Sequence, residues 1–134
     1  MKKLSFLLFA ICLAFTSCTN NDDPKENESK KLDKMYQEII TSSLVNSEAC
    51  TDSNNWEITA LGSKACGGVA SYIIYSKKID KEAFLTKVKA YTEAQTAFDK
   101  KWNIMSTCDI IKPPFGVECV EGKPKPFYQN DFAY

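Results

Sequence analysis

Residues 1–18 limit what the rest of the chain can fold into. Two lysines are followed by an almost wholly apolar run over residues 4–15, and two small residues then precede Cys18. This run is too short to cross a bilayer as a helix, which needs about 20 residues. A positive start before a short apolar core is typical of an export signal. We therefore expect the remaining chain to fold outside the cytoplasm, where disulfide bonds persist.

The end of this segment carries a more specific signal. Residues 13–18, Leu-Ala-Phe-Thr-Ser-Cys, resemble a lipobox, the signal of bacterial lipoproteins, with Phe15 where most lipoboxes have leucine. The resemblance implies that residues 1–17 are a signal peptide, and that Cys18 is acylated on its thiol and amine. It implies an anchor in the outer membrane, on the periplasmic or the cell-surface side. The acidic pair at 22–23 resembles a surface-export signal; the alternative is that acidic residues are simply common in a solvated tether.

The composition of the mature chain argues against several classes of function. Removing 17 of 134 residues leaves 117, with 15 lysines against 17 acidic residues. This balance offers no net positive charge to bind nucleic acid. The chain contains neither histidine nor arginine, so it lacks the usual general base near neutral pH and the bidentate cation that binds phosphate. We therefore expect no enzyme, no cofactor and no nucleic-acid partner.

Four cysteines lie beyond the signal, at Cys50, Cys66, Cys108 and Cys119. An even number of cysteines in an exported chain predicts two disulfide bonds, for which three pairings are possible. We favour Cys50–Cys66 with Cys108–Cys119, because both close short loops. A zinc site built from four thiolates is the alternative, but it needs paired cysteines a few residues apart, and the gaps here are 16, 42 and 11.

Two segments have helical periodicity. Residues 19–31 contain no apolar side chain, so we expect 18–31 to be an acylated cysteine with a disordered tether, and 32–134 to be a single domain. Apolar residues recur every three or four positions over 32–45, which predicts a short first helix. Asp80 is placed to cap a long amphipathic helix that runs to about Asn103.

The strands are predicted from alternation and turn residues. Residues 56–61 and 115–120 have the composition of strands, and a turn at Glu121–Gly122 leads to a possible returning strand over 127–134. Residues 69–75 fit either a strand or a short helix. The fold class that follows is α+β: a small disulfide-stabilised domain with one long amphipathic helix packed on a few short antiparallel strands.

A second resemblance covers residues 50–128. It is carried by Gly-Ser-Lys-Ala-Cys-Gly-Gly at 62–68, by Tyr-Ile-Ile-Tyr-Ser at 72–76, and by Trp56, Trp102 and the cysteines around them. The pattern is similar to a group of small exported lipoproteins, many of which have proline where this chain has Val69. The resemblance implies a shared disulfide-tied fold and brings no activity and no functional residue.

These observations favour a non-catalytic binding module that faces an unknown protein or glycan partner. The segment Pro113, Pro114, Phe115 and Gly116 is the candidate binding loop, because the expected Cys108–Cys119 bond would hold both of its ends and limit the entropy lost on binding. A loop of that kind would suit an inhibitor of a hydrolase. The alternative is a structural component of the envelope without a soluble ligand.

Overall fold

The computed structural model describes residues 23–129, which fold as an α+β domain and confirm the predicted class. The described chain contains two helices, one short 3-10 helix and four strands. In order they are α1 (Pro24–Ser42), η1 (Ser53–Asn55), β1 (Trp56–Ser63), β2 (Val69–Ser76), α2 (Lys81–Lys101), β3 (Gly116–Val120) and β4 (Lys123–Phe127). The expected long helix is α2, but α1 is nearly as long, with 19 residues against 21.

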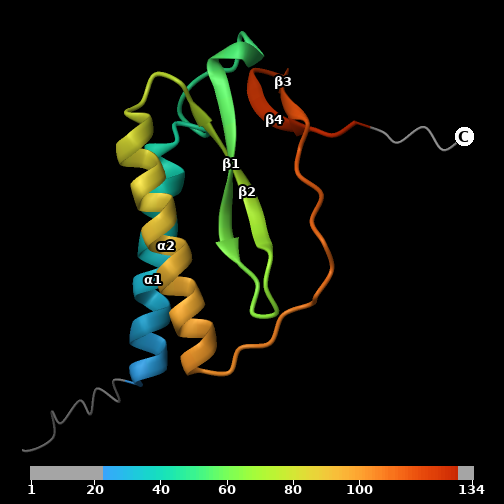
Figure 1. Ribbon diagram of the computed structural model, residues 1–134. Helices are drawn as coiled ribbons and strands as arrows, with labels where there is room; N and C mark the ends of the chain where they lie inside the picture. The colour runs from blue at the N-terminus through green and yellow to red at the C-terminus, as the bar shows by residue number, and fades with distance from the viewer. Residues whose placement is uncertain (1–22, 130–134) are drawn as a thin grey trace, which may run out of the picture.

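The strands form two separate antiparallel hairpins, β1–β2 and β3–β4. The two helices lie side by side on one face of β1–β2, and the β3–β4 hairpin lies near the end at which β1 begins (Figure 1). The pairing of β1 with β2 runs from Trp56 opposite Ser76 to Ser63 opposite Val69. Residues 69–75, for which a strand and a helix were both open, are therefore a strand.

Alternation along β1–β2 divides the core into two clusters. The first faces the helices, where Leu61, Ile73 and Tyr75 pack with Ile39 of α1 and with Phe84 and Val88 of α2. The second lies on the opposite face and consists of Cys50, Trp56 and Ile74, with Val117 and Cys119 of β3 packed against it. The domain is therefore stabilised from both faces of a two-stranded sheet that would be marginal alone.

The prediction of a disordered tether is wrong for residues 24–31, because α1 already begins at Pro24. The Asp23 side chain accepts a hydrogen bond from the Lys25 amide at 2.9 Å, and proline suits the first position of a helix. Glu28 then accepts a hydrogen bond from the indole of Trp102 at 2.9 Å and pairs with Lys101. Contacts with α2 thus stabilise a turn that has no apolar face of its own. Residues 18–22 lie outside the described part of the chain.

Helix α2 confirms the prediction from periodicity and capping. The Asp80 side chain accepts a hydrogen bond from the Ala83 amide at 3.0 Å, and Phe84 and Val88 of the predicted stripe are buried. The helix ends at Lys101, and Asn103 follows with a φ of 49°. None of the helices within residues 23–129 is apolar over a length that would traverse a bilayer.

The favoured disulfide pairing is wrong. The structure joins Cys50 to Cys119, with 5.3 Å between their Cα atoms, and leaves Cys66 and Cys108 as thiols. Cys50 lies beside the start of β1, whereas Cys66 follows its end, and a strand of eight residues spans about 23 Å at about 3.3 Å per step. A disulfide requires a Cα separation below about 7 Å. The rigid strand therefore prevents the short-loop pairing.

The second hairpin ends earlier than predicted. Glu121 and Gly122 form the expected turn with φ values of 51° and 73°, and two positive φ values are typical of a tight two-residue hairpin turn. The returning strand is Lys123–Phe127 and not 127–134. Its two prolines are compatible with an edge strand, where one side of the backbone needs no donor. Residues 130–134 lie outside the described part of the chain.

Candidate binding surface

The predicted binding loop belongs to a longer irregular segment, residues 104–115, which we call the linker. The linker leaves the end of α2 and runs alongside the β1–β2 hairpin to β3 (Figure 1). Cys119 is bonded to Cys50, so the loop is not closed by the predicted Cys108–Cys119 bond. The basis for an entropically restricted inhibitor loop is therefore wrong.

The end of the linker is instead held by β4. The Phe115 amide donates a hydrogen bond to the Phe127 carbonyl at 2.8 Å. The two rings pack edge to face with centroids 5.9 Å apart. Phe115 nevertheless remains 72% exposed, and Phe127 and Tyr128 are also exposed. Of the predicted loop residues, Gly116 begins β3 and Pro113 is exposed to solvent.

An apolar groove of about 450 Å³ lies between β2 and the linker. Five consecutive residues of β2, 70–74, form part of one wall. Ile111 and Pro114 of the linker contribute to the groove, and so do Pro124, Pro126 and Tyr128 from β4 and the residue after it. Pro114 of the predicted loop thus lines a groove that the sequence did not reveal.

The groove follows the edge of β2. Side chains of consecutive strand residues point to opposite faces, so a surface lined by five in a row follows the edge of the strand and not one face. Among the residues that the structure describes, β1 is the strand that pairs with β2, and the Ser76 amide at the end of β2 also donates a hydrogen bond to the Ser43 carbonyl at 3.0 Å. The opposite edge of β2 therefore has no partner strand in the described chain.

The tip of the β1–β2 hairpin holds the linker at a second place. Lys64 forms an ion pair with the Asp109 carboxylate at 3.0 Å and donates a hydrogen bond to the Asp109 carbonyl at 2.6 Å. Hydrogen bonds with the Thr107 and Lys64 side chains lower the pKa of Asp109 to about 2. The Ala65 amide donates a hydrogen bond to the Ser106 hydroxyl at 3.0 Å. The tip of the β1–β2 hairpin, residues 64–68, is therefore the docking site of the linker.

The two remaining cysteines meet at this docking site. Cys66 and Cys108 are both exposed. Hydrogen bonding between their thiols lowers the pKa of Cys66 and raises that of Cys108. The four cysteines thus divide into one disulfide and one adjacent thiol pair, while Cys18 lies outside the described residues.

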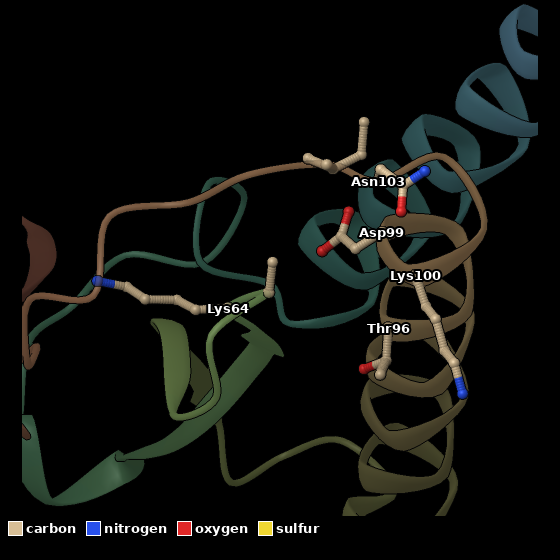
Figure 2. A pocket seen from close by; sticks show the side chains of 7 residues that line it. Lys64, Thr96, Asp99, Lys100 and Asn103 are labelled. Atoms are coloured by element: carbon tan, nitrogen blue, oxygen red, sulfur yellow. The ribbon is translucent and has the colours of Figure 1, made fainter.

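A polar cleft of about 350 Å³ lies between the hairpin tip and the last turns of α2. Figure 2 shows Thr96, Asp99 and Asn103 on the helix side of the cleft, with the Lys64 amine pointing away from them. Partial burial raises the pKa of Asp99. Neither lysine that lines this cleft approaches Asp99, because the Lys64 ammonium is paired with Asp109 and the Lys100 amine points away from the Asp99 carboxylate (Figure 2). We therefore take the apolar groove as the candidate binding surface.

Sequence reasoning missed most of the groove. Its walls come from α1, both hairpins and the linker, and no short motif brings such distant segments together. The one usable signal was the Pro-x-Pro spacing at 124–126, which indicates an edge strand. Within residues 23–129, no group of three or more histidine, cysteine or acidic side chains is arranged to hold a metal ion.

Comparison with known proteins adds no relative to this description. No protein-family model matches the chain, and no curated protein and no solved structure is significantly similar to it. The two resemblances drawn from the sequence, to bacterial lipoproteins and to a group of small exported lipoproteins, therefore stay predictions.

Proposed function

We propose that the protein is a lipid-anchored, non-catalytic binding module of the outer membrane, and that it binds an extended apolar segment of a partner protein in the groove along β2. The observation that carries this proposal is the groove itself, which follows a strand edge without a partner in the described chain. The exposed Tyr128 lines the groove, and the exposed Phe115 follows Pro114, which also lines it.

The chemistry of the two walls favours a polypeptide as the occupant. An unpaired strand edge offers backbone donors and acceptors that an extended peptide can satisfy, which is how many domains add a strand from a partner. The opposite wall contains Pro114, Pro124 and Pro126, whose backbone nitrogens donate no hydrogen bond. A partner strand would therefore pair with β2 and place apolar side chains against the prolines.

The surface beside the groove supports a protein partner. Phe115, Phe127 and Tyr128 are 72%, 43% and 47% exposed. Aromatic residues are enriched in protein interfaces, and a contiguous exposed apolar patch is unusual on a monomer that binds nothing. These side chains would supply contact area next to the hydrogen-bonded segment.

The proposed anchor is compatible with presentation of this surface. Five residues separate Cys18 from Pro24, so a chain of that length reaches at most about 20 Å from the lipid to the start of α1. Helix α1 begins at the end of the domain opposite to the β3–β4 hairpin (Figure 1). A domain held at the first turn of α1 would therefore expose the aromatic side chains on the side away from the bilayer.

The groove is tested with a capped hexapeptide of alternating valine and threonine. We expect its addition to the isotope-labelled full chain in detergent to shift amide resonances of Ala70–Ile74. The same hexapeptide with every backbone nitrogen methylated keeps the side chains and loses the donors on both edges, so we expect it not to bind. Shifts that fall elsewhere, or equal binding of the methylated peptide, would contradict pairing with β2.

A matched set of variants tests the aromatic residues. Replacing Phe115 and Tyr128 with alanine should weaken hexapeptide binding about tenfold, which corresponds to about 1.4 kcal/mol. Met105→Ala is the control, because Met105 is 91% exposed and apolar but does not line the groove and, unlike Phe115, is not next to a residue that does. If the control weakens binding as much as the aromatic double variant, the effect is not specific to the groove.

The anchor needs its own test. Mass spectrometry of the protein from its host should find a diacylglyceryl thioether on Cys18, and Cys18→Ala should release the protein from the membrane fraction. An unmodified chain that still starts at Met1 would refute the anchor. Cross-linking that recovers only neighbouring envelope components, with no hexapeptide binding, would favour the structural role instead.

A further inference from the structure

We propose that Cys66 and Cys108 form a second, exposed disulfide bond that fastens the linker to the tip of the β1–β2 hairpin and sets the position of the linker wall of the groove. The bond itself stands independently, while its effect on the groove rests on the proposed function. The thiol pair would thereby make binding responsive to oxidation.

Contacts on both sides already align the two cysteines. Lys64 and Ala65 bind Asp109 and Ser106, as described above. Between them, the Cys66 sulfur lies 3.6 Å from the Thr107 carbonyl oxygen and 3.8 Å from the Ser106 hydroxyl. Three consecutive residues of the hairpin tip thus contact Ser106, Thr107 and Asp109 of the linker. Cys108 lies between these residues and is hydrogen-bonded to Cys66.

The two thiols differ in a way that suits stepwise oxidation. The hydrogen bond with Cys108, assisted by Ser106 and by the nearby Lys64 charge, lowers the pKa of Cys66. The same pairing raises the pKa of Cys108. Since the thiolate is the attacking form, Cys66 is the first nucleophile and Cys108 the resolving thiol.

The oxidant required is a disulfide, either of a small thiol or of a protein. The Cys66 thiolate attacks one sulfur of that disulfide, which forms a mixed disulfide and releases one thiolate. Cys108 then loses its proton and attacks the Cys66 sulfur, which breaks the mixed disulfide and releases the second thiolate. The protein loses two electrons and two protons in total, and the oxidant gains them as two thiols.

The bond would act on the groove through a short stretch of linker. Ile111 and Pro114, which line the groove, lie three and six residues beyond Cys108. In the dithiol form the hairpin tip holds the linker through non-covalent contacts, namely one ion pair and hydrogen bonds. The Lys64 side chain is 10% exposed, but the Asp109 side chain is 64% exposed and open to solvent screening. A covalent bond at Cys108 would restrict the motion of this wall.

The native disulfide provides an internal reference. Cys50 is 3% exposed and belongs to a core cluster, whereas both Cys66 and Cys108 are exposed. Mild reduction should therefore open the Cys66–Cys108 bond and spare Cys50–Cys119, because attack on a disulfide depends on access to its sulfurs.

The bond is tested by treating the full chain with glutathione disulfide, blocking free thiols and mapping peptides by mass spectrometry. We expect a peptide pair joined through Cys66 and Cys108 that disappears on mild reduction while the Cys50–Cys119 pair persists. Continued alkylation of both thiols after oxidation, or a bond between two chains instead, would overturn the proposal.

The effect on the groove is measured on the same oxidised and reduced samples. Amide exchange over residues 104–115 should slow about tenfold on oxidation, and the valine–threonine hexapeptide should bind more tightly. The double variant Cys66→Ser, Cys108→Ser should show neither response. Equal hexapeptide binding in both redox states would refute only the claim that the disulfide bond affects the groove. No binding in either state would refute the proposed function, but the proposal of the Cys66–Cys108 bond would remain.

Discussion

Gly62 allows a prediction in which two physical effects are separated by a matched control. Its φ is +73°, its amide donates to the Thr92 hydroxyl at 3.1 Å, and an added Cβ would lie 2.4 Å from the Gln95 side-chain oxygen. Gly122 has the same φ of +73°, but a Cβ there meets no atom within 4 Å. Replacing each glycine with alanine therefore imposes the same backbone strain and adds a collision only at Gly62.

The magnitudes follow from these contacts. A left-handed conformation costs a residue with a Cβ about 1–2 kcal/mol, which is the whole effect expected for Gly122→Ala. At Gly62 the Gln95 oxygen must also move, although it accepts a hydrogen bond from the Ser63 amide at 3.2 Å. Loss of that bond and the tighter packing add about 1 kcal/mol each. We therefore expect Gly62→Ala to lower the free energy of unfolding by about 3–4 kcal/mol.

Guanidinium unfolding of the full chain under non-reducing conditions, followed by tryptophan fluorescence, measures both variants. A double-mutant cycle with Gln95→Ala then isolates the collision, since Gly62→Ala in that background should destabilise the protein only as much as Gly122→Ala does. Equal destabilisation by the two glycine substitutions in the parent chain would refute the collision. The collision would also be refuted if Gly62→Ala lowered the free energy of unfolding by the same amount with and without Gln95→Ala.

Two further predictions concern the disulfide and the linker contact. Replacing Cys50 and Cys119 with alanine removes a bond across a sequence separation of 69 residues, and the chain-entropy account predicts a loss of about 4 kcal/mol; an unchanged unfolding midpoint would contradict it. Asp109 has a pKa of about 2 in the fold against the usual 3.8 of an aspartate, so its stabilisation is complete above the higher pKa and is lost as the pH falls through the lower one. The Asp109→Asn variant has no such pH dependence, so the difference in unfolding free energy between the parent and the variant should shrink as the pH falls from 5 to 2. A difference that does not change with pH in that range would show that the Asp109 charge does not contribute to stability.

The elements that could be predicted are those with local causes. Helix α2 follows from the Asp80 cap and a stripe of apolar residues, and the Glu121–Gly122 turn follows from two residues that tolerate positive φ. Both depend on interactions within a few positions of the chain. The first turns of α1 could not be predicted in this way, because their partners Lys101 and Trp102 are more than 70 residues away.

The candidate site shows the same division. Pro114 and Phe115 were identified because they lie between two cysteines that were expected to bond, and that bond is not formed. The groove beside them exists only because β2, the linker and β4 converge. Its β2 residues resemble those of an ordinary half-buried strand in sequence, and their free edge is a property of the sheet order.

The sequence by itself determined that four cysteines follow the proposed signal, that the domain is α+β, and where its longest helix begins and ends. Only the tertiary structure decided that Cys50 pairs with Cys119 and that Cys66 meets Cys108. The physical reason is that a cap, a turn or a periodic helix is stabilised by neighbours in the chain. A disulfide instead requires two Cα atoms within about 7 Å. The eight residues of β1 keep Cys66, which is nearer in sequence, away from Cys50, whereas the β3–β4 hairpin brings Cys119 to it.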